Sequence, residues 1–471
     1  MSTLKKRTLG GYISSFHYTK KKQNRLDMNE ELMYYIWKSG QLFQKDLITV
    51  CGKKITVLNP GIRNLHEGPD FLHGRLKIND ITWIGQIEFH IKSSDWDIHG
   101  HQHDENYNNV ILHIVMEDDK EVFTKNGTRM PTLELAEHID NVQKEKFEFL
   151  MNNQSWIPCD PLLKYYSDQI FWPVYLSSLA VERLNRKTET ILKTLNEHKG
   201  DWEQTAIYFI LRYLIGRNNL TAVDEWTKET PWSVLRKYSS DRHKLEALVL
   251  GQAGFLEKDP YVDEYCKDLR KTYNYLSMLH NLSPVNPKYW KLFGLRPYSR
   301  PELRLSQFCD LLHRYQGLMG LLLSAKDANL LKQELKSVAH PYWDNHLKLD
   351  GKETKTFKKI TGEHTLNNLV LNAAAPLIFA YGQYTGNDEL KERALDWWEQ
   401  LPLEKNTIIR KWKQRGVVAG SAMETQGLIQ LKTNYCDNSN CLNCSLGHKI
   451  MAKSEMDNKV METIMEYFTT A

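Results

Sequence analysis

The chain has 471 residues, of which 41% are hydrophobic and 25% are charged, so it can bury a large core and is long enough for two or three domains. Its net charge of +4 excludes the strongly basic composition of many nucleic-acid-binding proteins, and any basic surface must be local. The apolar runs are shorter than the roughly 20 residues that span a bilayer. Seven cysteines, three of them close together near the end, suit a reducing compartment, so we expect a cytoplasmic protein without a membrane span.

The N-terminal stretch, residues 1–27, is expected to be a basic flexible arm. Seven Lys and Arg residues lie there among polar residues without a helical or strand period, and no apolar segment of a secretory signal follows them. The arm could contact phosphate groups, remain a solvated tail, or precede a natural start at Met28.

Residues 28–145 are predicted to form an α/β domain. An apolar spacing of three and four residues predicts a helix over 28–43, with Asn29 as its N-cap. Short runs rich in β-branched residues follow, separated by turn residues, and predict a largely antiparallel sheet. These runs are 47–61, 71–92 and 108–135.

Residues 146–430 are predicted to be a mainly α-helical domain, because amphipathic stretches rich in Leu, Trp and Tyr follow one another there. Prolines interrupt this pattern within 281–307. Arg296, Arg300 and Arg304 are spaced four apart in the same segment and could bind the phosphates of a nucleic acid, since guanidinium groups match phosphate oxygens. Pairing of these arginines with acidic residues of the helices is the alternative.

The candidate catalytic residues lie in "GPDFLHGRLKINDITWIGQIEFHIKSSDW", residues 68–96. Apolar and polar residues alternate in its second half, so a strand would place Glu88, His90 and Lys92 on one face. Asp70 and Glu88 could hold Mg or Mn through their oxygens, and Lys92 could orient the attacking water. The alternative is an exposed polar sheet face without chemistry.

This pattern resembles the restriction-endonuclease-like PD-(D/E)XK nuclease superfamily, whose motif is Pro-Asp, a hairpin, and then an acidic residue two positions before a lysine. The resemblance covers residues 29–120 and implies a mixed sheet, metal-dependent cleavage of phosphodiester bonds in DNA or RNA, and Asp70 and Glu88 as metal ligands. It also implies a catalytic carboxylate on the preceding helix, which Glu31 or Glu30 matches. His90 stands where the motif has its lysine, and Lys92 follows on the same strand face, so either could take that role.

Hairpin geometry sets a condition on this site. A two-residue turn at Asn79 and Asp80 would pair Asp70 with Phe89, which places Asp70 and Glu88 on opposite faces of the sheet. Only a bulge or kink near Asp70 would bring both carboxylates to one metal ion, and bulges are common beside active sites.

A histidine-rich stretch offers a different metal site. "DWDIHGHQHDENYNNVILH" contains His99, His101, His103, Asp104 and His113, and transition metals favour imidazole with carboxylate. An extended chain would place the first three histidines on one side, which suits a His-based metal hydrolase acting on another substrate. The stretch could equally be a polar loop or contact the substrate of the carboxylate site, and the last histidine, in an apolar run, is expected in the core.

The C-terminal segment, 431–471, is predicted to bind a structural metal. Cys436, Cys441 and Cys444 are followed closely by His448, and these four could hold zinc. Alternatively, Cys159 could be the fourth ligand of zinc or of an iron–sulfur cluster. Three unlinked thiols are the remaining possibility. The other cysteines are expected to be buried thiols; these are Cys51, Cys266 and Cys309.

Residues 28–450 also resemble an uncharacterised bacterial family known only as a domain of unknown function. The similarity is carried by "ELMYYIW", "GPDF", "EFHIKSSDW", "HGHQHDENYNNVILHIV", "WIPC", "NPKYWKLFGLRP" and "SAMETQGLIQLKTNYC" with "CLNC". It implies no activity.

The resemblance to the PD-(D/E)XK nucleases makes a metal-dependent nuclease our leading hypothesis. The alternative is a non-catalytic nucleic-acid-binding or interaction protein of degenerate nuclease fold, and a His-based metal hydrolase is a further one. No nucleotide-binding loop and no serine-hydrolase motif is present.

Overall fold

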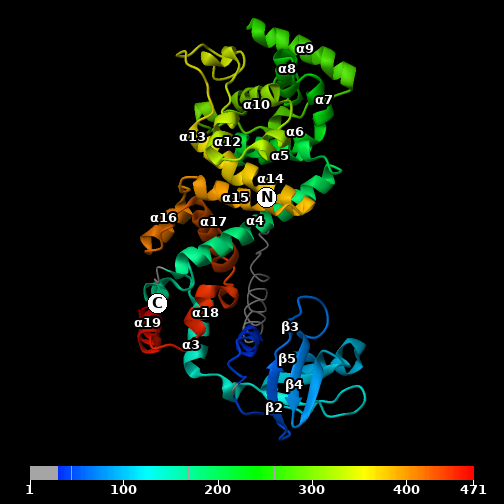
Figure 1. The fold of residues 1–471 in the computed structure, drawn as a ribbon, viewed down its shortest axis with the longest axis vertical. Coiled ribbons are helices and arrows are strands. Elements are labelled where there is room, and N and C mark those ends of the chain that lie inside the picture. The colour runs from blue at the N-terminus through cyan, green and yellow to red at the C-terminus, as the bar shows by residue number, and fades with distance from the viewer. Residues whose placement is uncertain (1–29, 44, 167–169, 258–260, 471) are drawn as a thin grey trace, which may run out of the picture. The chain divides into compact units, whose positions relative to one another are not determined.

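The computed structural model describes residues 30–43, 45–166, 170–257 and 261–470 (Figure 1). The chain divides into two compact units. The sheet unit contains the chain up to Tyr166 together with Thr433–Ala471, and the helical unit is Ser167–Lys432. The helical unit is thus an insertion in the sequence of the sheet unit. The C-terminal cysteine segment, which we predicted as a separate part, belongs to the sheet unit, and the basic arm predicted for 1–27 lies outside the described residues.

The sheet unit begins with a helix over residues 30–38, and a sheet of seven strands follows. In space the strands run in the order β1-β2-β4-β5-β6-β7, and β3 pairs with β4. The pairs from β1 to β5 are antiparallel, whereas β5–β6 and β6–β7 are parallel. The sheet is therefore mixed, as the resemblance implied, with antiparallel pairs as far as β5 and parallel pairs beyond it. The strands are β1 Leu47–Ile48, β2 Lys54–Asn59, β3 Ile62–Arg63, β4 Phe71–Ile78, β5 Ile81–Lys92, β6 Val110–Glu117 and β7 Thr132–Glu134.

The parallel pairing of β5 and β6 requires a connection that crosses from one end of the sheet to the other. This crossover, residues 93–109, contains three short helical segments, which are α2 Asp95–Ile98, η1 His101–His103 and η2 Glu105–Tyr107. The crossover therefore returns the histidine-rich stretch to β5, the strand that carries both Glu88 and His90.

A bulge in β4 fulfils the condition that hairpin geometry placed on Asp70. The turn at Asn79 and Asp80 is confirmed, since the strands on either side pair directly across it. The register then shifts by one residue between Phe71 and Gly74, where His73 adopts a φ of +59°. Because of this shift the chain brings Asp70 level with Glu88 instead of Phe89, and the two carboxylates lie on the same face.

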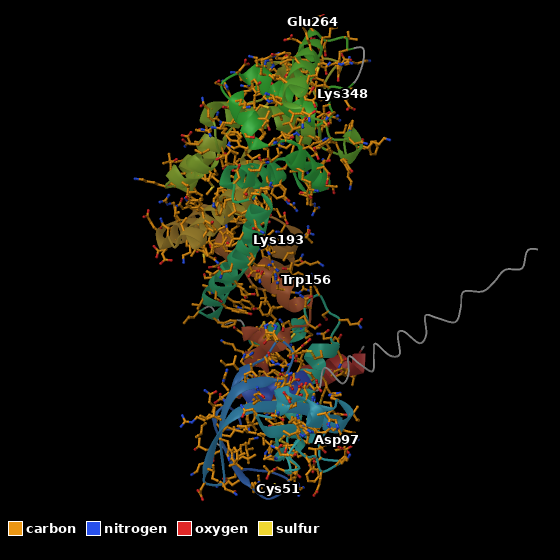
Figure 2. The ribbon with its side chains drawn as sticks, turned by 90° about the vertical axis from the view of Figure 1, so that its right-hand side faces the viewer. Cys51, Asp97, Trp156, Lys193, Glu264 and Lys348 are labelled. Atoms are coloured by element: carbon orange, nitrogen blue, oxygen red, sulfur yellow. The ribbon has the colours of Figure 1, made fainter. Side chains whose placement is uncertain are left out.

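Aromatic side chains join the helix over 30–38 to the sheet. The Tyr34 ring lies 5.0 Å from the Phe89 ring, and Trp37 packs against the same ring at 6.1 Å. Figure 2 shows the side chains from a second direction, with Cys51 and Asp97 labelled in this unit. The C-terminal residues return through α18 Ser445–Met451 and α19 Asp457–Thr470, and the buried Lys146 of α3 Asn141–Asn152 bonds Asp457 at 2.7 Å.

The helical unit confirms the predicted α-helical character of the middle of the chain. Its core contains several fully buried tryptophans, among them Trp226 and Trp398. The proline-containing segment has only short turns, and α10 starts at Pro301. Among the described helices, none is long and apolar enough to span a bilayer. The helices are α4 Phe171–Glu197, α5 Trp202–Ile215, α6 Leu220–Glu229, α7 Trp232–Lys237, α8 Arg242–Gln252, α9 Glu264–His280, α10 Pro301–Tyr315, α11 Met319–Ser324, α12 Ala328–Leu335, α13 Glu363–Leu369, α14 Ala375–Thr385, α15 Asp388–Gln400, α16 Thr407–Gln414 and α17 Ala422–Gln430.

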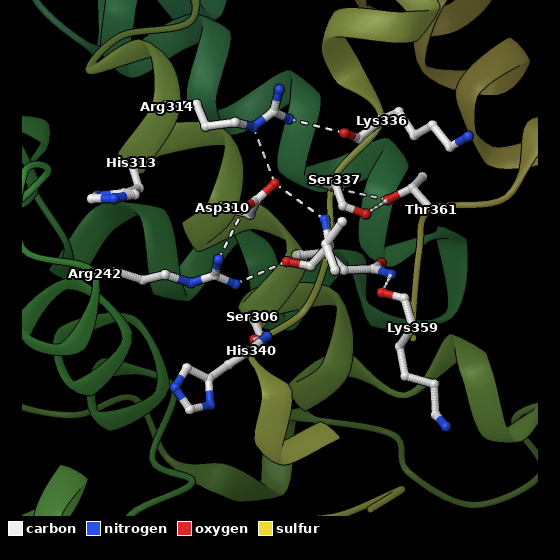
Figure 3. A network of polar contacts seen from close by, with 12 residues as sticks. Arg242, Ser306, Asp310, His313, Arg314, Lys336, Ser337, His340, Lys359 and Thr361 are labelled. Carbon is white, nitrogen blue, oxygen red and sulfur yellow. Dashed lines mark hydrogen bonds and ion pairs between the residues drawn. The ribbon is translucent and has the colours of Figure 1, made fainter. Parts of the chain in front are cut away.

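A polar network around Asp310 joins α8, α10 and the loop after α12 (Figure 3). The Asp310 carboxylate accepts hydrogen bonds from Arg242 and Arg314 and from the Val338 N–H, each at 3.1 Å. Both guanidinium groups also donate to backbone carbonyls of the loop, at Val338 and Lys336. One nearly buried carboxylate therefore holds three segments of the chain together.

We expect Asp310→Asn to lower the free energy of unfolding of the helical unit by about 2 to 4 kcal/mol, because it leaves two guanidinium groups without their shared counter-charge. Glu389→Gln is the matched control, since Glu389 also pairs with an arginine but its side chain is 78% exposed. Urea unfolding should show a change of a few tenths of a kcal/mol for the control. Equal effects of the two substitutions would contradict the role of Asp310.

Candidate metal centre

Two neighbouring strands place three ionisable side chains on one face of the sheet. Glu88 and His90 are two residues apart on β5, and His113 on β6 pairs with Glu88 in the parallel register. All three side chains are buried. Nδ1 of His90 lies 2.8 Å from Nε2 of His113, which fixes the His90 ring and turns its Nε2 toward the crossover.

The crossover adds two more imidazoles to this face. His99 follows α2, Gly100 makes a left-handed turn at φ +76°, and His101 opens η1. Nδ1 of His99 lies 3.1 Å from Nε2 of His90. Each of His90, His99 and His101 offers one ring nitrogen to a group whose members lie within 4.8 Å of one another.

These separations fit a transition metal. Two imidazole nitrogens on a tetrahedral Zn²⁺, each at about 2.0–2.1 Å, are roughly 3.3 Å apart. The His90 and His99 nitrogens come close to this value, at 3.1 Å. Oε1 of Glu88 lies somewhat further out, 3.7 Å from Nε2 of His90 and 3.5 Å from Nε2 of His101. The three histidines could therefore hold a metal ion together, and a carboxylate oxygen lies beside them.

Burial makes the donor set suitable for a cation. It lowers the pKa of His90 to about 2 and that of His101 to about 4, and neighbouring imidazoles add to the effect. It also lowers the pKa of His113 to about 3. These imidazoles are thus neutral near pH 7 and keep a lone pair for a metal. Burial, assisted by the Asp70 charge, raises the pKa of Glu88 to about 9, because a carboxylate is unfavourable in this buried site. A nearby cation would stabilise the ionised form of Glu88.

Aromatic rings hold the His101 side chain in place. The Tyr107 ring stacks on it at 3.8 Å, and Trp96 packs edge-on against it at 5.4 Å. Within the described residues, Nε2 of His101 is buried and makes no hydrogen bond, although Glu88 stands beside it. A buried nitrogen without a hydrogen-bond partner costs free energy unless something binds it, which a metal ion would do.

Asp70 supports Glu88, and both of its carboxylate oxygens accept hydrogen bonds from other protein groups. Its Oδ1 accepts from the Tyr34 hydroxyl at 3.0 Å and from Arg63 at 2.5 Å, and its Oδ2 accepts from the Phe89 N–H at 3.0 Å. The Asp70 N–H in turn donates to Oε2 of Glu88 at 3.0 Å. The predicted pair of carboxylates does come together, but Asp70 orients Glu88 and does not share a set of open oxygens with it.

The other predicted catalytic residues lie at different places. Nζ of Lys92 lies 3.3 Å from Glu117 and 3.9 Å from Asp119 on the surface. On the helix, Glu30 is the carboxylate whose charge acts on Glu88, whereas Glu31 acts on Arg63. His90 thus occupies the motif position of the lysine and takes part in the centre.

The fold changes the grouping of histidines that the sequence suggested. We expected His99, His101 and His103 on one side of an extended stretch. The chain instead forms a 3-10 turn there, and His103 is exposed. His90, which we had grouped with the carboxylates, completes the cluster. His113 is buried as expected, but it contacts a ligand candidate and is more than a packed core residue.

The predicted arginine site does not form one open row. Arg300 pairs with the buried Glu302 at 2.6 Å, and Arg304 donates to Gln307 and Thr365. Arg296 is exposed. Arg300 thus pairs with an acidic residue, as the alternative expected, whereas Arg304 is engaged by an amide and a hydroxyl side chain.

A pocket of about 410 Å³ adjoins the Asp70 side of the centre. Tyr34 and Arg63, which both bind Asp70, line it together with Lys38. Leu442 and His448 from the C-terminal segment complete its wall. A ligand there would thus touch the residues that position Glu88.

Residues 30–407 match the model of a family described as protein of unknown function (DUF2851), and the chain belongs to this family. No curated protein and no solved structure matches the chain. The family model covers the sheet, the crossover with its histidines and most of the helical unit, but it ends before the last three cysteines.

The pKa of Glu88 predicts how the stability of metal-free protein depends on pH. Because the folded pKa, about 9, exceeds the unfolded value, the folded state retains a proton that the unfolded state has lost, and stability falls as pH rises toward 9. The lowered histidine pKa values act below about pH 6.5, where they make stability rise with pH. Between pH 7 and 9, Glu88 should therefore contribute a fall of at most about 1.4 kcal/mol per pH unit.

Thermal unfolding in chelator at pH 7, 8 and 9 measures this contribution. We expect Glu88→Gln to remove the fall, since the amide does not ionise. A matched control is Glu105→Gln, whose carboxylate pairs with Lys125 on the surface of the same unit and is 83% exposed. The same decline in wild type and Glu88→Gln protein would show that Glu88 does not have a raised pKa.

Proposed function

We propose that the protein is a metal-dependent hydrolase of phosphodiester bonds in nucleic acid, with a transition metal held by His90, His99 and His101. Glu88 acts as the general base. A divalent cation at three imidazoles supplies a Lewis acid and an activated water, which is the chemistry that such hydrolysis needs. The observation that carries this function is the convergence of three ring nitrogens within 4.8 Å beside the Glu88 carboxylate.

Each side chain then has a role that its contacts support. Oε2 of Glu88 is held by the Asp70 N–H, so Oε1 stays directed at the histidines. A cation held by the imidazoles would favour the ionised form of Glu88, which from there can accept a proton from an attacking water. Arg63 and Tyr34 fix Asp70 and so fix Glu88 indirectly.

The substrate class rests on the order of residues along the chain. A helix carboxylate, Pro69-Asp70, a bulged hairpin, and Glu88 two positions before His90 follow the order of the PD-(D/E)XK motif. The charge of Glu30 acts on Glu88, as that order implies. The mixed sheet is compatible with this class of fold, and the position of Lys92 on the surface makes His90 the replacement for the motif lysine.

Hydrolysis assays with metal-free and reloaded protein test this function. The substrates are single- and double-stranded DNA, RNA and bis(p-nitrophenyl) phosphate, each with Mn²⁺, Zn²⁺ or Mg²⁺. We expect turnover of at least one substrate with Mn²⁺ or Zn²⁺ and none in chelator. Loaded protein that binds nucleic acid without turnover would favour the non-catalytic alternative, and loaded protein that neither binds nor cleaves would reject the nucleic-acid substrate.

A further inference from the structure

The segment of the helical unit between α9 and α10 exposes cations and aromatic rings in alternation. Residues 281–301 contain no Asp or Glu. Six exposed side chains of this segment alternate between a positive charge and a ring, and they are Lys288, Tyr289, Lys291, Phe293, Arg296 and Tyr298. The Phe293 ring is completely exposed, so its apolar surface contributes nothing to the core. The fold itself therefore makes no use of this ring.

Buried contacts fix the backbone of this segment. The Trp290 side chain is buried, and its Nε1–H donates to the Ala253 carbonyl at 2.8 Å. The Asn219 side chain accepts a hydrogen bond from the Lys291 N–H at 2.6 Å. Leu292 packs against the core of the unit. The indole and aliphatic side chains thus face the protein, whereas the cations and the other rings face outward.

A second exposed segment, residues 351–360, meets the first one through aromatic rings. The Tyr298 and Phe357 rings pack edge-on at 5.4 Å. Nζ of the buried Lys359 lies 3.3 Å from the centre of the Phe357 ring and 5.6 Å from that of Tyr298. These contacts join the segments into one surface. We call it the aromatic-basic surface, and it consists of the six side chains of the first segment together with Lys352, Lys355, Phe357 and Lys358.

Positive charge is concentrated on this surface. Within the part of the chain that the structure describes, none of its cations forms an ion pair with a carboxylate; these are Lys288, Lys291, Arg296, Lys352, Lys355 and Lys358. Exposed lysines elsewhere in the unit do pair, as Lys244 does with Asp241 at 2.8 Å. The two segments contain one acidic residue, Glu353, and the whole chain carries a net charge of only +4. Such a local excess of positive charge attracts a polyanion.

We infer that the aromatic-basic surface binds single-stranded nucleic acid, with bases stacked on the exposed rings and phosphates beside the cations. Rings that alternate with cations suit a strand in which bases alternate with phosphates. A duplex keeps the faces of its bases inside its own stack, so the exposed rings would find no partner there. A membrane surface would favour exposed indole and aliphatic groups, but Trp290 and Leu292 face the core.

The choice of nucleic acid rests on the proposed function. The inference goes further in two respects, because it names a single strand as the substrate and assigns its binding to the helical unit. Neither the description of the family nor the histidine centre of the sheet unit gives these segments a role.

Fluorescence anisotropy of labelled oligo(dT) and oligo(U), about 20 nucleotides long, tests the inference with full-length protein in chelator. We expect Phe293→Ala to weaken binding about tenfold, because a base loses its stacking partner. The ring is completely exposed, so the fold should persist. Arg296→Glu should weaken binding at least about tenfold and reduce its dependence on salt. The matched controls are Tyr275→Ala and Lys326→Glu, which change an exposed ring and an exposed lysine outside the surface and should stay within about twofold.

Binding in chelator does not depend on the metal centre, which keeps this inference separate from the proposed function. Metal-loaded protein that binds the single strand through this surface without hydrolysing it would reject the hydrolase and support the inference. Where hydrolysis occurs, Phe293→Ala should raise the KM for single-stranded substrate about tenfold. Equal affinity of wild type, Phe293→Ala and Arg296→Glu, tighter binding of duplex than of single strand, or binding only to vesicles of phosphatidylserine and phosphatidylcholine would each overturn the inference.

Discussion

His101→Ala should lower the affinity of the protein for Zn²⁺ or Mn²⁺ by at least a hundredfold. The substitution removes one of three nitrogens that lie within 4.8 Å of one another, and two imidazoles hold a divalent ion much more weakly than three. His90→Ala should act at least as strongly, because it also removes the ring that His113 orients. Isothermal titration and metal analysis after gel filtration measure both effects.

His103→Ala is the matched control for this loss. It changes an exposed histidine in the same 3-10 turn and should leave affinity within about twofold. If His103→Ala weakened binding as much as His101→Ala, the whole loop and not the three-nitrogen group would hold the metal. Metal binding that survives His90→Ala and His101→Ala together, in protein whose cysteines have been exchanged for serine, would contradict the centre.

Glu88→Gln should reduce phosphodiester hydrolysis by about a hundred- to ten-thousandfold, which is the usual contribution of a general base. Metal affinity should change by less than about tenfold, since the three histidines remain. The glutamine keeps the volume and the hydrogen bond from the Asp70 N–H, so the fold should persist. Asp70→Asn should have a smaller effect of the same kind, because it loosens Glu88 without removing it.

The comparison of the two measurements separates the roles of Glu88. If Glu88→Gln loses activity but still binds the metal, the result supports Glu88 as the general base. Loss of metal as complete as in His101→Ala would make Glu88 a ligand, and full activity with retained metal would reject both roles. Lys92→Ala is expected to be active, as its ammonium pairs with Glu117 and Asp119 on the surface. An inactive Lys92→Ala variant would restore the motif lysine to its usual role.

Much of the fold follows from local sequence signals. The change from alternating apolar residues to a helical apolar spacing predicts the division into a sheet-containing part and a helical part. The turn-forming pair Asn79 and Asp80 predicts the hairpin turn, which the strand pairing confirms. The parallel pairing of β6 was not predicted, because it depends on a crossover whose direction no local pattern records. The bulge at His73 was recognised as a requirement, but a histidine at positive φ gives no sequence signal of its own.

The candidate site was predictable in its residue types and not in its grouping. His99 and His101 were identified, but their partner His90 lies on a strand and was assigned to the carboxylate motif. The crossover brings its histidines next to His90 on the strand. The alternation of side chains along an extended chain, on which the sequence prediction relied, could not show this. Cys159 was named from the sequence as a possible fourth ligand of the C-terminal cysteines, and that ligand set stays a prediction.

Anomalous diffraction from crystals of the protein loaded with Zn²⁺ or Mn²⁺ tests the central claim most directly. We predict a peak about 2.0 to 2.2 Å from a ring nitrogen of each of His90, His99 and His101, with Glu88 beside it. A peak bound only by carboxylate oxygens of Asp70 and Glu88, or loaded crystals with no peak among the three imidazoles, would contradict it.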